Sequence, residues 1–129
     1  MNYTIETLNF IKPKKGNKGA TFKIDRNGIY ISVPVAENLG IADWKHIAWA
    51  EIPNEKNKFI LIGYENLEAV HPQLKPYLLN VQDVKQRDNV SAIKIQNKDL
   101  TSRYDFGVIE AEKINVNNSN AILCKIINN

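Results

Sequence analysis

The feature that most constrains this chain of 129 residues is a proline and a glycine, Pro34 and Gly40, that interrupt an apolar stretch. The residues before Pro34, "FKIDRNGIYISV", alternate as strands do, and Asn27-Gly28 suits the positive φ values of a hairpin turn. Proline cannot donate to a strand ladder but is accepted in the first turn of a helix, and glycine suits the left-handed residue that ends one. We therefore predict two strands, a short helix from Pro34 to Gly40, and further strands.

The next residues predict a second hairpin. "HIAWAEI" reads as a strand, "PNEKN" as a turn and "KFILIGY" as the returning strand. The segment after it, "ENLEAVHPQLKPYLLNVQDV", has helical spacing interrupted by Pro72 and Pro76. We expect a short helix or loop before Pro76 and an extended run after it.

The chain also matches itself when it is shifted by 62 residues without gaps. The identical pairs are Lys23 with Lys85, Asn27 with Asn89, Ile31 with Ile93, Asp43 with Asp105, Ile47 with Ile109, Ile52 with Ile114, Ile60 with Ile122 and Leu61 with Leu123. Most of the matched apolar positions are ones expected in a core, which favours an internal duplication. We predict a single domain, 1–129, with a first repeat over 20–64, a second over 82–126 and a basic N-terminal extension over 1–19.

The predicted fold class is mainly β with short helices, a β-rich α+β fold. Two similar strand–helix–strand-hairpin repeats would pack into one barrel-like domain. The second copy runs through "VKQRDN", "VSAIKI", a helical "NKDLTSRY", "GVIEAEKI" and "AILCKII". The N-terminal "YTIETLNFI" adds a possible extra strand.

The first repeat resembles the AbrB/MazE-type swapped-hairpin module. The residues that carry the resemblance are "IDRNGIYISVP", "ENLGIADWKHIAWAEI" and the closing "NKFILI". Two such units in one chain resemble the duplicated MraZ-type version of this fold. The resemblance implies intertwined β-barrels that bind DNA through basic residues of strands and loops. The chain departs from the family pattern because Ile29, and not arginine, follows Gly28, and Arg26 is the nearby candidate for the missing arginine.

The positive charge is concentrated at the start of the chain. Residues 1–30 hold six basic and two acidic side chains, whereas the whole chain has a net charge of +3, so the remainder is at −1. Such a basic head either attracts phosphates or is simply a solvated segment. The candidate DNA-binding residues are Lys12, Lys14, Lys15, Lys18, Lys23 and Arg26.

No residue cluster indicates catalysis or a metal or cofactor site. His46 and His71 lack the spacing of metal ligands, and Cys124, the only cysteine, reads as a small apolar residue of the last strand. Asp43 and Asp105 recur before aromatic residues, where a turn or cap role is favoured over acid–base catalysis. We expect no enzyme activity.

The aromatic residues divide into two groups. Trp44 and Phe106, with Trp49 and Tyr104, could stack on bases, but their positions in the repeat favour core packing. Tyr30 should face away from Ile29 and Ile31 and is a candidate surface contact.

Two functions remain open. The first is a small non-enzymatic DNA-binding protein, a transcriptional regulator of swapped-hairpin type. The alternative is a protein-interaction module, either a homo-oligomeric scaffold or a mobile-element-encoded inhibitor that docks on another protein through a strand edge or a patch around Tyr30. No apolar run approaches the roughly 20 residues that span a membrane, and the N-terminus does not read as a secretory signal, so we expect a cytoplasmic protein. We also expect a homo-oligomer.

Overall fold

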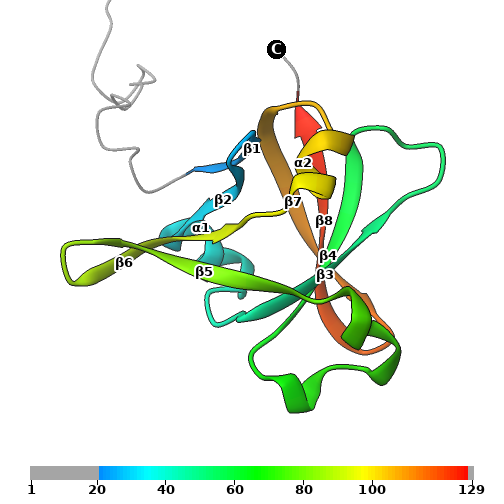
Figure 1. The fold of residues 1–129 in the computed structure, drawn as a ribbon, viewed down its shortest axis with the longest axis horizontal. Coiled ribbons are helices and arrows are strands. Elements are labelled where there is room, and N and C mark those ends of the chain that lie inside the picture. The colour runs from blue at the N-terminus through cyan, green and yellow to red at the C-terminus, as the bar shows by residue number, and fades with distance from the viewer. Residues whose placement is uncertain (1–20, 128–129) are drawn as a thin grey trace, which may run out of the picture.

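A computed structural model describes residues 21–127, which form a closed antiparallel barrel of eight strands with a few short helices (Figure 1). Neighbouring strands follow the order β1-β2-β6-β5-β3-β4-β8-β7 around the barrel. The predicted class, mainly β with a barrel-like domain, is confirmed at this level. The elements are β1 (Phe22–Asp25), β2 (Gly28–Ser32), α1 (Val33–Leu39), β3 (His46–Glu51), β4 (Lys58–Tyr64), the 3₁₀ helices η3 (Leu67–Ala69) and η4 (Pro72–Tyr77), β5 (Leu79–Gln86), β6 (Asn89–Ile95), α2 (Lys98–Arg103), β7 (Gly107–Val116) and β8 (Ser119–Ile127).

The predicted end of the first helix is confirmed, and its start lies at Val33, one residue before the predicted Pro34. Pro34 lies in the first turn of α1, where its missing N–H costs nothing. Gly40 follows the helix with a φ of 74°, and its N–H donates to the carbonyls of Ala36 and Glu37. Because this left-handed conformation is costly for other residues, glycine sets where α1 ends.

The second helix, α2, is capped by an asparagine side chain at its start. α2 has neither proline nor glycine at its ends, and the side chain of Asn97 accepts a hydrogen bond of 3.0 Å from the backbone N–H of Leu100. In the connection between the two halves, η4 runs through Pro76 to Tyr77, and the extended β5 begins at Leu79. The extended run after Pro76 is thus confirmed, although the helical turn ends at Tyr77, two residues later than predicted. The strand expected at residues 3–11 lies outside the described residues.

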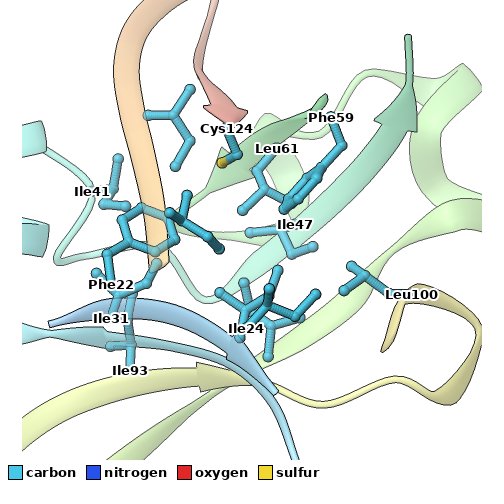
Figure 2. Packing of buried hydrophobic residues seen from close by; sticks show 14 of the residues in the cluster. Phe22, Ile24, Ile31, Ile41, Ile47, Phe59, Leu61, Ile93, Leu100 and Cys124 are labelled. Carbon is cyan, nitrogen blue, oxygen red and sulfur yellow. The ribbon is translucent and has the colours of Figure 1, made fainter. Parts of the chain in front are cut away.

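A single large core fills the barrel (Figure 2). Ile31 of β2 lies directly opposite Ile93 of β6, and both are almost fully buried. Ile47 and Ile109 belong to the same core. α1 and α2 each add a buried side chain to it, Ala36 and Leu100.

The predicted equivalence of residues 62 positions apart does not hold in the last strand, β8. Ile60 is half-buried and packs against a second, smaller cluster, whereas its predicted counterpart Ile122 is fully buried in the main core. Leu61 faces the core, but Leu123, its predicted counterpart, lies opposite Ile60. Since side chains alternate between the two faces of a strand, a slip of one residue reverses every assignment in β8.

The second cluster lies on the outer side of the barrel wall. Its buried members are Ile62 and Tyr64 of β4, Val70 of the connecting segment and Ala121 of β8. Leu74 and Leu78, with Ile60, Ile114 and Val116, pack against it. The segment 65–78, drawn in green below the barrel in Figure 1, therefore covers the outer face of β4, β8 and β7, which we call the covered wall. No helix within residues 21–127 is long and apolar enough to cross a membrane.

Candidate nucleic-acid interface

The outer face of the opposite wall carries a row of polar side chains across four neighbouring strands. Lys23 of β1 is the register partner of Tyr30 of β2, Tyr30 is the partner of Lys94 of β6, and Lys94 is the partner of Gln82 of β5. Inward core residues flank Lys23, Tyr30 and Lys94 in sequence, namely Phe22 and Ile24, Ile29 and Ile31, and Ile93 and Ile95. Gln82 is exposed and follows Val81, which packs against the core. The four side chains therefore point outward, and we call them the Tyr30 row.

Tyr30 has a lysine on each side in this row. The Lys23 ammonium lies 5.7 Å from the centre of the Tyr30 ring, within the range of a cation–π contact. Lys23 also lies 3.4 Å from a carboxylate oxygen of Asp25, and the two side chains are 46% and 35% exposed. An exposed pair of this kind is weak and breaks readily when a stronger anion arrives.

The row continues onto β7 with exposed apolar side chains. Val108 is the register partner of Lys23 and is 56% exposed, and Phe106, two residues earlier, is 51% exposed. The result is a surface on which Tyr30 lies between two lysines, Val108 lies beside Lys23, and Phe106 precedes Val108 by two residues. We call the five residues Phe106, Val108, Lys23, Tyr30 and Lys94 the basic–aromatic face.

The exposure of Phe106 overturns the expectation that it packs in the core. Its predicted counterpart Trp44 is buried because it packs over Gly63, where even a methyl group would overlap the indole ring. Gly63 lies opposite Ile47 in the β3–β4 hairpin, whereas Ile126 lies opposite Ile109 in the β7–β8 hairpin. The β7–β8 hairpin thus has isoleucine at the position where the β3–β4 hairpin has the glycine that accommodates Trp44, and Phe106 is exposed.

The predictions for Tyr104, Trp49 and Tyr30 agree better with the structure. Tyr104 is buried, as expected, and Trp49 is half-buried against the core. Tyr30 faces away from Ile29 and Ile31, as the alternation predicts.

The basic residues predicted from sequence are only partly brought together. Lys23 is on the basic–aromatic face, and Arg26 is an exposed residue of the β1–β2 turn. That turn is held by a hydrogen bond of 2.8 Å from the Asn27 N–H to the Asp25 carboxylate. Lys12, Lys14, Lys15 and Lys18 lie outside the described residues.

Sequence reasoning missed Lys94. The alternation in "VSAIKI" places Lys94 opposite in direction to Ile93 and Ile95, so its outward orientation was readable. The sequence does not indicate that β6 pairs with β2, because the two strands are far apart in the chain.

The buried titratable groups are held in their neutral forms. Burial, with a smaller contribution from Glu51, raises the pKa of Tyr104 to about 12. Burial also raises the pKa of the Cys124 thiol, so this residue behaves as the small apolar side chain that was expected. The Tyr104 hydroxyl has no hydrogen-bond partner among the described residues.

The remaining candidates have local partners. Nδ1 of His46 lies 3.2 Å from Oδ1 of Asn80, and Nδ1 of His71 accepts a hydrogen bond from the Gln73 N–H. Asp105 pairs with Lys56 at 3.8 Å. Within residues 21–127, no three His, Cys, Asp or Glu side chains are grouped to hold a metal ion.

Comparison with known proteins adds no relative: no family model, curated protein or solved structure matches this chain.

Proposed function

We propose that this protein is a small non-enzymatic DNA-binding protein, with the basic–aromatic face as part of its contact surface. The observation that carries the proposal is the alternation of Lys23, Tyr30 and Lys94 on three adjacent strands, extended by the exposed Phe106. Lysines attract phosphates, and aromatic rings stack on bases of any sequence, so this combination suits a nucleic-acid strand lying across the sheet.

The same proposal includes a regulator of the swapped-hairpin type built from two similar halves. Three observations support this part. Each half consists of two strands, a short helix and two further strands. The strand order around the barrel is unchanged when β1–β4 and β5–β8 are exchanged. The equivalent residues Ile31 and Ile93 lie opposite one another, as an approximate two-fold axis through that pair requires.

Each residue of the face has a distinct role in this proposal. Lys23 exchanges its weak pair with Asp25 for a phosphate, and Lys94 binds a second phosphate on the other side of Tyr30. The Tyr30 and Phe106 rings stack on exposed bases. Arg26, at the neighbouring turn, contributes a further phosphate contact.

The test is binding of fluorescently labelled single-stranded and duplex DNA at two salt concentrations, measured by anisotropy. Lys23→Ala/Lys94→Ala should weaken binding and reduce the slope of log K against log salt by about 1.5, because two phosphate contacts are lost. Tyr30→Ala should weaken binding of single-stranded DNA by about 1–3 kcal/mol, the usual contribution of one stacked base.

The matched control is Lys58→Ala/Lys125→Ala. These two lysines are also register partners in adjacent strands, but they belong to β4 and β8. If this control weakens binding as much as the test variant, the basic–aromatic face is not the contact surface. If wild-type protein binds neither DNA and instead retains a protein partner from nuclease-treated host extract, the protein-interaction module is the better description.

A further inference from the structure

The β5–β6 hairpin extends beyond the barrel wall and leaves one strand edge open. In Figure 1 it projects away from the barrel, to the left of β2. On its outer side β5 pairs with β3 only through Leu79 and Asn80. Among the described residues, no strand pairs with the stretch 82–86 on that side.

The direction of the backbone groups along this edge can be established. The Val81 N–H donates a hydrogen bond of 2.9 Å to the carbonyl of Lys45, so Val81 directs its backbone groups outward from the hairpin. Backbone groups of successive residues in an antiparallel strand point to opposite sides. Asp83 and Lys85 therefore also direct their N–H and C=O groups to the open edge. The Val84 carbonyl points toward β6, where it accepts a hydrogen bond from the Ser91 hydroxyl.

The side chains along the same edge are complementary to themselves. If two copies of β5 are placed antiparallel about an axis at Val84, Asp83 of one copy lies opposite Lys85 of the other, and the reverse holds. The two Val84 side chains then meet at the centre, and Gln82 lies opposite Gln86. Opposite charges on directly facing strand residues are stabilising.

From this edge we propose that two copies of the chain associate through β5, paired antiparallel about Val84. Asp83 and Lys85 form hydrogen-bonded pairs with the partner copy, and the close, non-hydrogen-bonded pair is Val84 with Val84, which brings two half-buried apolar side chains together. The Asp83 carboxylate exchanges a loose contact of 4.0 Å with Lys45 for the lysine of the other copy. This association does not depend on the proposed DNA binding.

The hairpin limits such pairing to two copies. Between Val84 and Lys85 the register with β6 shifts, from Val84 opposite Ala92 to Lys85 opposite Val90, so Ser91 is an extra residue in β6. A bulge of this kind bends the strand and disrupts its outer edge. The regular β5 edge is used once by each copy, so the contact closes as a two-fold dimer.

Charge reversal provides the test, with dimerisation followed by sedimentation over a range of protein concentrations. Asp83→Lys places lysine opposite lysine, Lys85→Asp places aspartate opposite aspartate, and each should weaken the dimer by about tenfold. Mixing the two single variants restores opposite charges at both positions, so a heterodimer should form about as well as the wild-type dimer. The double variant Asp83→Lys/Lys85→Asp should dimerise like wild type.

The control is Asp88→Lys, which makes the same change of net charge in the β5–β6 turn, away from the paired edge, and should leave dimerisation unchanged. Circular dichroism verifies that each variant is folded. As a second measurement, the amide hydrogens of Asp83 and Lys85 should exchange more slowly as protein concentration rises. A wild-type protein that is monomeric throughout, or single variants that do not recover on mixing, would overturn the proposal.

Discussion

The two walls of the barrel differ in what lies outside them. On the covered wall, outward side chains such as Ile62 and Tyr64 are apolar and buried beneath the segment 65–78. On the wall formed by β1, β2 and β6, the corresponding layer is Lys23, Tyr30 and Lys94, which are exposed or half-buried. Both walls share one interior, so the difference arises only from the outward half of each strand pattern.

The outward residues of the two walls should therefore have different roles, one set in stability and the other in binding. The apolar outward residues beneath the segment 65–78 belong to a second core, where substitutions should unfold the protein. Outward residues of the basic–aromatic face contribute little to burial, so substitutions there should change ligand binding and leave the fold intact. The following predictions test that separation, beginning with the largest expected effect.

An aspartate in the second cluster should destabilise the protein strongly. Val70 is 4% exposed, so Val70→Asp places a carboxylate among apolar side chains with no cation to pair with, and should lower the free energy of unfolding by about 3 kcal/mol. Urea unfolding followed by circular dichroism measures this change.

The matched control is the same substitution on the basic–aromatic face. Val108 is 56% exposed, so Val108→Asp should change the free energy of unfolding by no more than about 0.5 kcal/mol. Because Val108 is the register partner of Lys23, the new carboxylate should nevertheless weaken DNA binding. Equal destabilisation by the two substitutions would remove the distinction between the walls.

A methyl group at Gly63 should destabilise the covered wall from its inner side. The added carbon of Gly63→Ala overlaps the indole of Trp44, and displacing that ring should cost about 2 kcal/mol in urea unfolding. In a Trp44→Ala background the same substitution should cost much less, because the overlapping group is gone. A cost that is the same in both backgrounds would show that Trp44 is not the group displaced.

The smallest effect is expected at Tyr104, in the shared interior. Tyr104→Phe removes a buried hydroxyl that has no partner among the described residues, so the free energy of unfolding at pH 7 should stay the same or rise slightly. The pKa of Tyr104 is about 12 in the folded protein, above the ordinary tyrosine value of 10.0, so the folded protein holds the proton more tightly. The stability that comes from this difference in pKa between the folded and unfolded states is therefore fully present below pH 10. It is lost as the pH rises from 10 to 12.

Tyr104→Phe should remove this part of the alkaline destabilisation. The measurement is urea unfolding at pH 7 and at pH 11, with Tyr77→Phe as control, because Tyr77 is 66% exposed. If the two variants lose the same stability between pH 7 and pH 11, Tyr104 is not responsible for the alkaline loss.

Local signals in the sequence predicted the elements well. Pro34 and Gly40 mark α1 because one lacks an N–H and the other tolerates positive φ, and both properties act within a single turn. Predictions that depended on distant partners were less successful. Phe106 was placed in the core by analogy with Trp44, but the glycine over which Trp44 packs comes from another strand, and the second half has Ile126 at the corresponding position.

The candidate site shows the same limit. Lys23 and Tyr30 are close in sequence and were both singled out, whereas Lys94 joins them only through the pairing of β2 with β6. The alternation in each strand predicted which side chains point outward. It held no information on which outward side chains would become neighbours.

The sequence by itself determined the strands, their turns, the limits of α1 and the inward or outward direction of most side chains, since these depend on residues a few positions apart. The tertiary structure decided the order of strands around the barrel, which wall is covered by the segment 65–78, and which lysines flank Tyr30. The physical reason is that backbone hydrogen bonds are alike for almost all residues. The choice of strand partner therefore follows from burying the apolar faces of the whole chain together, and no short stretch of sequence records that outcome.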